Sequence, residues 1–449
     1  MLTWLRKHMK TIMVVVAVLF AASMFYGIGY QGIKGDWGKG KASNVLAKVN
    51  GQEVDPLRYQ EILNRVAQGA SQGLGIQDMP FIENLALQQA VDFTLMLSEA
   101  RRKVRVPGRE VDAAIEGIMR QQNVPSKREL ENALKRMGLS MGKFRDLIWG
   151  ELMVQKLVTK LRDEVRVTPD DLREIRASHI LISAEGDAKT VISRIKAGED
   201  FASLAKQLSR DSLSGKKGGD LGYFTTGMMP TPFEKAAFSL KVGEVSGIVK
   251  TTLGFHIIKL VDSRLRKFPG AEKDPEQAAL KQKQDNAFRQ WYAEVQSKAK
   301  VEVISPAMKA HGMRFSGAIQ QAAEEYKKAI LQTPMNPYLH VFLGDTYNTM
   351  GQKAMAISEY ESAVKLEGGN PELYLILGKA YTDAGQGSLA AEQFKKASLV
   401  AGDNKALHER LLKQFQAMNR SVEAARERAE ISRITKKESF EQGIKSSPR

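Results

Sequence analysis

The sequence predicts a multidomain protein that combines a single N-terminal transmembrane helix, a helical domain, a small α+β domain and an all-α solenoid of repeats. Three observations predict this architecture. An uncharged apolar stretch follows the first ten residues, strand and helix patterns alternate near the middle of the chain, and from about residue 305 a motif recurs every 34 residues. A chain of 449 residues is long enough for about three or four domains of ordinary size.

Composition narrows the class of protein and of partner. A hydrophobic content of 43% with 26% charged residues is typical of folded chains. The net charge is +16, but the basic residues are spread along the chain. Acidic headgroups or polyanions are therefore expected neighbours, whereas no basic stripe or motif indicates nucleic acid. The chain has no cysteine, which excludes disulfides and thiolate metal ligands and fits an oxidising compartment.

The first segment is predicted to be a membrane anchor over residues 1–30. Basic residues precede an uncharged run whose apolar centre is Ile12–Tyr26, close to the roughly 20 residues that span a bilayer. A cleaved signal peptide and a retained anchor both fit this pattern. We favour the anchor, because the run is long and its one acceptable cleavage site, Ala21–Ser23, lies inside it. The preceding basic residues favour a cytoplasmic N-terminus.

A Gly- and Lys-rich linker over 31–45 leads into a helical domain over 46–172. From Pro56 to Arg166 apolar residues recur at helical spacing, with proline and glycine as punctuation, and this region contains no histidine. A purely structural helical scaffold and a cradle with an apolar groove for extended polypeptide both remain open.

Residues 266–304 are expected to return to this helical domain. A polar helix over 274–295 ends in a short alternating strand, and a similar short strand opens the helical domain at 46–50. Because a lone strand is not stable, we predict that strand 46–50 pairs with strand 299–303. The helical domain would then be built from both sides of the segment between them.

Residues 305–432 repeat with a period of 34. Small residues at the repeated positions let paired helices approach closely, and aromatic residues fill the gaps between them. The matching positions are Asn336/Asn370, Gly344/Gly378, Tyr347/Tyr381, Ala356/Ala390, Tyr360/Phe394 and Ala363/Ala397. This pattern resembles a tetratricopeptide array with two full units, a half unit before them and a degenerate cap after them. The polar tail, 433–449, is expected to be disordered.

The repeats are expected to bind a protein partner. The fifth, sixth and ninth positions of the two first helices are Val341, Phe342 and Asp345, then Leu375, Ile376 and Lys379. Only one of these six is cationic, so they do not suit an acidic C-terminal tail. Two alternatives stay open for the four apolar residues: they pack between repeats, or they form an exposed patch that takes an apolar peptide or helix.

Residues 173–265 form the small α+β domain. Its first and last predicted strands carry His179 and His256, with a glycine-rich stretch at 218–222 between them. A histidine on an apolar strand is most often a hydrogen-bonded core residue. Two such histidines could therefore bond each other inside the sheet and have a structural role alone.

Four motifs in this domain resemble, in order and spacing, those of the parvulin-type peptidyl-prolyl isomerases: Ser178–Ile182, Gly218–Gly222, Pro232–Phe233 and Gly254–Ile258. With the anchor, the helical domain and the helix after the module, the chain resembles the SurA/PpiD/PrsA-like extracytoplasmic chaperones. The resemblance implies an α+β parvulin domain and an α-helical chaperone domain. It also implies that His179, Asp211 and His256 are catalytic, and that Leu221, Met229, Phe233 and Thr251 bind the substrate. At Leu253 some relatives carry a hydroxyl residue, which Thr251 or Thr252 would replace here.

These residue types suit rotation about an amide bond. An X–Pro amide isomerises slowly because twisting it breaks amide resonance, at a barrier of about 18–20 kcal/mol. No bond is made, so no nucleophile, metal or cofactor is required. An apolar pocket can hold the proline ring while a poorly solvated polar network stabilises the twisted amide more than the planar one. Acidic Glu185 and Asp187 would repel phosphate, so no dependence on substrate phosphorylation is expected.

The resemblance thus implies an isomerase and folding chaperone that is single-pass in the inner (cytoplasmic) membrane, with the bulk of the chain on the periplasmic side. Its partners would be unfolded or secreted polypeptides with X–Pro bonds, and a protein bound by the repeats. The alternative is a non-catalytic chaperone, or a scaffold of an envelope or secretion complex, that uses these folds only for binding. The presence of the implied site residues favours the isomerase.

Overall fold

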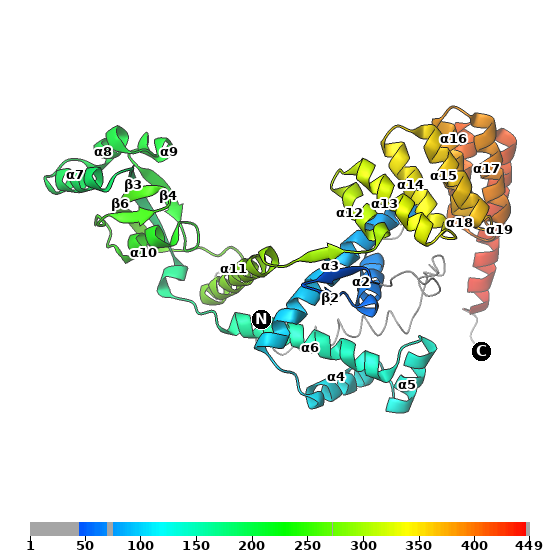
Figure 1. Ribbon diagram of the computed structural model, residues 1–449, viewed down its shortest axis with the longest axis horizontal. Coiled ribbons are helices and arrows are strands. Elements are labelled where there is room, and N and C mark those ends of the chain that lie inside the picture. Colours follow the sequence, from blue (N-terminus) through cyan, green and yellow to red (C-terminus); the bar gives the residue numbers. More distant parts are fainter. Residues whose placement is uncertain (1–44, 70–74, 272, 446–449) are drawn as a thin grey trace. The chain divides into compact units, whose positions relative to one another are not determined.

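The computed structural model describes residues 45–69, 75–271 and 273–445. Figure 1 shows the chain with many of its helices and strands labelled. The chain divides into two compact units: unit 1 is Met1–Lys156 with Lys298–Arg449, and unit 2 is Leu157–Ser297. The expected anchor at 1–30 lies outside the described residues. Among the helices that the structure does describe, none is both long enough and apolar enough to cross a membrane.

The N-terminal part of unit 1 is helical, as its apolar spacing predicts. Pro80 stands in the first turn of α3, where a backbone N–H would have no partner within the helix. Three basic residues stand at the other end of α3, where cations interact favourably with the helix dipole. The helices are α2 (Pro56–Gly69), α3 (Met79–Lys103), α4 (Gly108–Gln121), α5 (Lys127–Arg136) and α6 (Met141–Asp163), and a 3₁₀ turn, η1 (Ile76–Asp78), precedes α3. Helix α6 begins in unit 1 and ends in unit 2.

A three-stranded sheet joins the two parts of unit 1. Its strands are β1 (Ala47–Val49), β2 (Gln52–Glu53) and β7 (Val301–Val303), in the order β2-β1-β7. Strand β1 pairs antiparallel with β7 in the register Ala47↔Val303, Lys48↔Glu302 and Val49↔Val301. The predicted pairing of the segments at 46–50 and 299–303 is therefore confirmed.

The repeats form pairs of antiparallel helices, which are counted below in chain order as the first to the fourth repeat. The half unit expected before the two full units is therefore a complete helix pair. The helices are α12 (Pro306–Phe315), α13 (Ile319–Gln332), α14 (Pro337–Thr349), α15 (Lys353–Leu366), α16 (Pro371–Asp383), α17 (Gly387–Val400), α18 (Lys405–Ala417) and α19 (Ser421–Lys445). A Cβ placed on Gly344 would lie 2.5 Å from the Tyr360 ring, and one on Gly378 would lie 2.4 Å from the Phe394 ring. The repeated glycines are thus required by the close approach of the two helices within each repeat.

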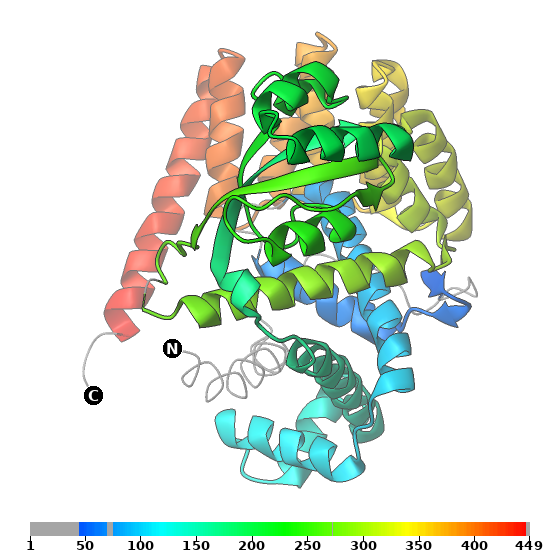
Figure 2. The same ribbon diagram turned by 90° about the vertical axis from the view of Figure 1, so that its left-hand side faces the viewer.

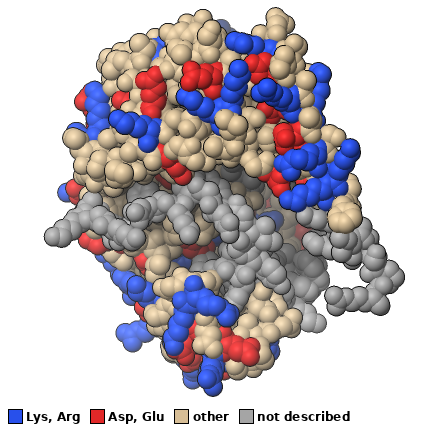
Figure 3. Space-filling model, turned by 90° about the vertical axis from the view of Figure 1, so that its right-hand side faces the viewer, with Lys and Arg blue, Asp and Glu red and all other residues tan. Residues whose placement is uncertain are grey.

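The structure decides between the alternatives for the apolar positions of the repeats. Val341, Phe342, Leu375 and Ile376 are all buried in the core of the array. They therefore pack between repeats, and the exposed apolar patch is absent at these described positions. On the face of the molecule drawn in Figure 3, Lys and Arg side chains are interspersed with Asp and Glu, so the positive net charge forms no uniform basic surface there.

The expectation that the C-terminal tail is disordered from residue 433 onward is wrong for its described part, which is helical. Helix α19 continues through Lys445. Ile434 on this helix is buried, and Asp403 accepts hydrogen bonds from Arg433 (2.7 Å) and Lys437 (2.6 Å) of the same helix. The polar composition of the tail therefore reflects a solvated helix face held by ion pairs rather than an unfolded chain.

Unit 2 is built on a four-stranded antiparallel sheet in the order β4-β3-β6-β5. The strands are β3 (Arg173–Ile182), β4 (Asp220–Phe224), β5 (Val249–Thr251) and β6 (Gly254–Leu265). Helices α7 (Glu185–Lys196) and α8 (Phe201–Leu208) cover one face, and α10 (Thr231–Ser239) covers the other (Figure 2). A short helix, α9 (Ser212–Gly215), follows α8.

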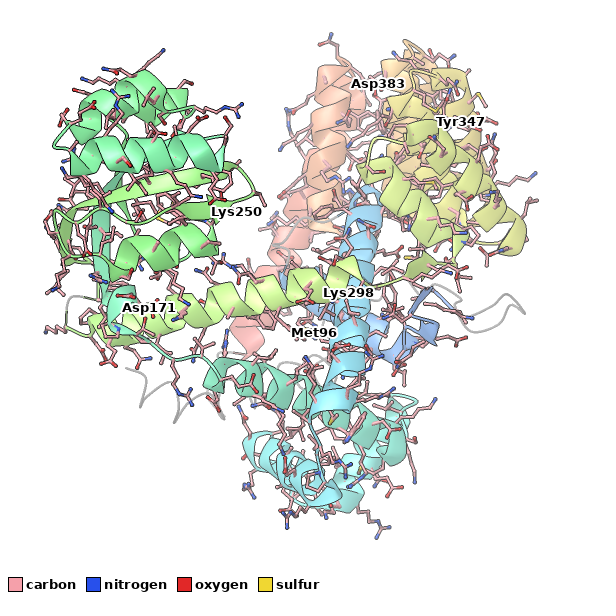
Figure 4. The ribbon with its side chains drawn as sticks, turned by 60° about the vertical axis from the view of Figure 1, so that its left-hand side comes forward. Met96, Asp171, Lys250, Lys298, Tyr347 and Asp383 are labelled. Atoms are coloured by element: carbon pink, nitrogen blue, oxygen red, sulfur yellow. The ribbon has the colours of Figure 1, made fainter. Side chains whose placement is uncertain are left out.

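Helix α11 (Pro275–Ser297) also belongs to unit 2. Lys283 on this helix donates a hydrogen bond to Oδ2 of Asp171 (2.7 Å). Asp171 lies in the 3₁₀ turn η2 (Pro169–Leu172) and is labelled in Figure 4. Asp171 also accepts the backbone N–H of Thr168 (2.7 Å) and the hydroxyl of Thr226 (2.8 Å). The expected return segment is thus divided, because its helix packs in unit 2 whereas its strand, β7, pairs in unit 1.

Candidate active site

Strand alternation brings the two histidines together. On β3 the odd positions Ile175 and Ala177 face α10, and His179 follows them on the same face. On β6 the even position Ile258 faces α10, as does His256. The strands pair with His179 opposite Ile258 and His256 opposite Leu181, so the two histidines are diagonal neighbours on one face of the sheet.

A continuous chain of hydrogen bonds runs through the pair. Thr251 Oγ1 lies 2.7 Å from His256 Nε2, the two Nδ1 atoms lie 3.1 Å apart, and His179 Nε2 lies 2.8 Å from Asp211 Oδ2. An ionised carboxylate only accepts, so His179 Nε2–H donates to Asp211. His179 Nδ1 then accepts from His256 Nδ1–H, and His256 Nε2 accepts the Thr251 hydroxyl proton. This assignment satisfies every ring nitrogen with both histidines neutral.

Burial and hydrogen bonding set the charges of this chain. Burial alone would raise the pKa of Asp211, but hydrogen bonds from Ser214, His179 and the backbone N–H groups of Leu213 and Ser214 lower it to about 2. Burial, reinforced by neighbouring His179, lowers the pKa of His256 to about 4 against the opposing effect of Asp211. At neutral pH the site therefore holds one carboxylate and a neutral His256.

The glycine-rich stretch holds the site together. Gly218 and Gly219 have φ of +73° and +86°, a conformation that glycine adopts readily. The carbonyl of Gly219 accepts the backbone N–H of His179 (2.9 Å), and a Cβ on Gly219 would lie 2.4 Å from the His179 carbonyl oxygen. This contact fixes the Asp211 loop against β3, which places the carboxylate beside the imidazole.

An aromatic ring lies beside both histidines. Phe233 on α10 is 2% exposed, and its ring meets His179 and His256 edge to face, with centroid distances of 5.7 Å and 5.3 Å. Leu221 and Met229 are partly buried and pack against the same apolar cluster. The structure thus brings the three residues expected to hold the proline ring together beside the polar chain.

Ser214 was missed by the sequence reasoning. It is 5% exposed, its hydroxyl donates to Asp211 Oδ2 (2.5 Å), and its oxygen lies 3.1 Å from His179 Nε2. The signal that could have found it is its spacing: Asp211 caps helix α9, and the third residue after a cap lies within reach of the cap side chain.

Of the two hydroxyl residues before Leu253, Thr251 is the one whose side chain reaches the histidine pair. Its oxygen contacts His256 and accepts the backbone N–H of Leu253 (3.1 Å), whereas the neighbouring Thr252 is exposed. The Leu253 side chain is 67% exposed. In the part of the chain that the structure describes, no group of three or more His, Asp or Glu residues is arranged to hold a metal ion.

Comparison with protein families divides the chain in the same way. Residues 158–264 match the PPIC-type PPIase domain, residues 1–158 match the SurA-like N-terminal domain, and residues 337–370 match a tetratricopeptide repeat.

Two curated proteins illustrate the relatives of this chain. The foldase protein PrsA of Caldanaerobacter subterraneus subsp. tengcongensis is 30% identical over 308 residues, which cover 63% of this chain and 94% of that one. The foldase protein PrsA of Bacillus subtilis is 42% identical over 170 residues, and there the match covers 35% of this chain and 56% of the relative.

Solved structures with similar segments include a parvulin and a peptidylprolyl isomerase. The parvulin NmPin of Nitrosopumilus maritimus is 53% identical, with 20% of this chain and 97% of that chain covered and a TM-score of 0.19. The peptidylprolyl isomerase PrsA of Bacillus anthracis is 28% identical, with 47% of this chain and 96% of that chain covered and a TM-score of 0.27.

Proposed function

This chain belongs to the PrsA family of foldases, and from that membership we propose that it is anchored in the inner membrane and acts on unfolded or secreted polypeptides outside the cytoplasm. The expected resemblances to parvulin isomerases, SurA-like domains and tetratricopeptide repeats are confirmed, and the chain is a parvulin-type peptidyl-prolyl isomerase. The anchor and the location are supported by the uncharged apolar run at 11–33, by the basic residues before it and by the lack of cysteine.

The proposed catalytic residues are His179, Asp211 and His256. The observation that carries this proposal is the unbroken hydrogen-bonded chain from Thr251 to Asp211, with the Phe233 ring against both imidazoles. Every ring nitrogen in this chain is already bonded, which suits positioning and polarity rather than attack on the substrate.

In the proposed mechanism, the proline ring of the substrate lies against Leu221, Met229 and Phe233, and the preceding carbonyl lies near Asp211. In the planar state, amide resonance places partial negative charge on that carbonyl oxygen. In the twisted state the resonance is lost, and the oxygen carries less negative charge. An ionised Asp211 therefore repels the planar amide more than the twisted one, which lowers the barrier. His179 and His256 hold the carboxylate in place, and no bond is formed or broken.

We also propose that the helical domain over 46–172, with β7 added, is the chaperone part, and that the repeats over 305–432 are a separate protein-binding part. The support is the match of residues 1–158 to SurA-like N-terminal domains, the repeat match at 337–370, and the β1–β7 pairing. The competing proposal for these two parts is that they form a scaffold of an envelope or secretion complex.

Isomerisation of X–Pro tetrapeptides by the full chain, measured by a protease-coupled assay, tests the proposal. We expect acceleration by the wild-type chain and at least a tenfold lower kcat/KM for His179→Ala, with the far-ultraviolet circular dichroism unchanged. Unchanged turnover in folded His179→Ala would remove the histidines from the catalytic set. Binding of a Pro-containing client without any acceleration would favour the scaffold.

A further inference from the structure

The first two repeats share a polar contact that the later repeats lack. In the first repeat His311 Nδ1 lies 2.8 Å from the Tyr326 hydroxyl, and 34 residues later Asp345 accepts the Tyr360 hydroxyl at 2.7 Å. One period further on, the two positions are Lys379 and Phe394, and Phe394 has no hydroxyl to donate. We call the four residues of the first two repeats the repeat site: His311, Tyr326, Asp345 and Tyr360.

Each polar pair of the repeat site continues to a residue near the start of α3. His311 Nε2 lies 2.8 Å from Glu83 Oε2, and Gln77 Nε2 donates to Asp345 Oδ1 at 2.5 Å. His311 is fully buried, and Glu83 and Asp345 are buried as well. A buried imidazole needs a partner at both nitrogens, so Tyr326 alone would leave His311 half satisfied. The segment at 76–83 supplies the missing partner, and we call it the docking segment.

Apolar contacts accompany these hydrogen bonds. Ile76 and Met79 of the docking segment are buried in the same cluster as the apolar residues of the repeats. Helix α3 packs against α12, and the turn η1 packs against α14. Six residues advance a helix by about 9 Å, so Gln77 and Glu83 can reach two successive repeats at once. Polar and apolar contacts therefore alternate along the docking segment.

We propose that the repeat site is a binding surface for the chain's own docking segment, and that this occupation closes the first two repeats to other peptides. The surface fits a short helical segment with an amide side chain and a carboxylate six residues apart and with apolar residues beside the amide. A peptide from another protein with this pattern binds only when it displaces residues 76–83. Partners that lack the pattern are left to the later repeats, where the polar pair is replaced by Lys379 and Phe394 and then by Lys413 and Arg428.

The test uses the full chain and a fluorescent peptide with the sequence of residues 75–90. In a docking-segment variant, Gln77→Ala, Met79→Ser and Glu83→Ala are combined, which should free the repeat site. We expect the peptide to bind this variant at least tenfold more tightly than the wild-type chain. A control peptide with alanine in place of Gln77 and Glu83 should bind at least tenfold more weakly. Adding His311→Ala and Tyr360→Phe to the docking-segment variant should abolish binding.

Equal binding to the wild-type chain and the docking-segment variant would overturn the proposal, as would equal binding of the two peptides. Failure of the peptide to bind a folded variant would do the same. Isomerase turnover reports on unit 2 and is expected to stay unchanged, so the result is independent of the proposed isomerase mechanism.

A second pair of variants covers the case in which the triple substitution does not fold. Gln77→Glu places a second carboxylate against Asp345, and Asp345→Asn restores a carboxylate–amide pair with the polarity reversed. Hydrogen exchange of α12–α15 should speed up at least fivefold in Gln77→Glu and return toward the wild-type rate in the double variant. An unchanged rate in Gln77→Glu, or the absence of any recovery, would contradict specific docking.

Discussion

His179 and His256 meet through their Nδ1 atoms at 3.1 Å, on rings whose planes differ by 22°. Only one of the two nitrogens can carry a proton in this contact, because two N–H donors would face each other without an acceptor. The geometry thus excludes a pair in which both imidazole rings are protonated at both nitrogens. It links the protonation of the site directly to the stability of the sheet that holds it.

This link predicts a pH dependence of stability. Burial and His179 lower the pKa of His256 from 6.5 to about 4 in the folded chain. Between pH 4 and pH 6.5, His256 is protonated in the unfolded chain but not in the folded chain. The stability that neutral His256 contributes to the folded chain is therefore complete above pH 6.5 and is lost as the pH falls toward 4. The change should be about 3 kcal/mol, seen as a lower opening free energy for amides of β3 and β6 in hydrogen exchange. His256→Gln should remove this pH dependence, and a stability that rises on acidification would contradict it.

Ser214→Ala should weaken the site through Asp211. The hydroxyl donates to an ionised carboxylate, a type of bond worth about 1.5–3 kcal/mol, so kcat/KM should fall about tenfold. Without this donor the pKa of Asp211 should rise by about one unit, and the acid limb of turnover should move upward. Exchange spectroscopy of an X–Pro peptide between about pH 1.5 and 8 measures both effects, because the wild-type limb lies near the Asp211 pKa of about 2. Ser214→Thr should retain more turnover than the alanine variant, and exposed Ser239→Ala serves as the control. An unmoved acid limb in Ser214→Ala would show that the serine is only a packing residue.

Met229→Ala and Phe233→Ala should lower turnover through loss of contact with the proline ring. Truncating a large buried side chain removes about 2–5 kcal/mol, part of it from folding, and Phe233 has the greater share in the core. We therefore expect a rise in KM for Met229→Ala and a combined loss of stability and turnover for Phe233→Ala. The matched control is the adjacent Met228→Ala, since that side chain is 63% exposed. Wild-type turnover in both folded site variants would remove them from the pocket.

Gly378→Ala should destabilise the third repeat. The new methyl group would stand 2.4 Å from the Phe394 ring, and overpacking of this kind costs about 1–3 kcal/mol. Hydrogen exchange of α16 and α17 should speed up accordingly, and Phe394→Leu should restore part of the loss by making room. Gly369→Ala is the control, because a Cβ there meets nothing within 4 Å. Equal effects at both glycines would indicate a general response of the array to alanine.

The sequence alone predicted the features that depend on local pattern. The strand pattern predicted that His179 and His256 lie on strands of one sheet and could bond each other, and the 34-residue period predicted the paired helices. The pairing of β1 with β7 was also predicted, since the sequence pattern showed no partner near either segment. The structure adds a second partner for β1, the adjacent strand β2, which the pattern did not indicate.

Features that depend on contacts between distant segments were not predictable from local pattern. The burial of Val341 and Leu375 depends on the packing of neighbouring repeats, and the contact of Glu83 with His311 joins residues 228 positions apart. The helical tail was missed because its composition is polar, whereas its order depends on Asp403 in an earlier helix connection. Ser214 was missed because its role depends on the cap geometry of a helix of four residues.

The pairing of β1 with β7 has a consequence for the order in which the chain folds as it is made. Residues of unit 2 are consecutive, from Leu157 to Ser297, so this unit can fold as soon as it has emerged from the ribosome or the translocation channel. Strand β1 is synthesised long before β7, so the edge of β1 that pairs with β7 stays unpaired until Val303 has been synthesised. The isomerase domain is therefore complete while the domain that flanks it in sequence is still unfinished, and prolines of the chain's own later segments emerge next to a folded isomerase.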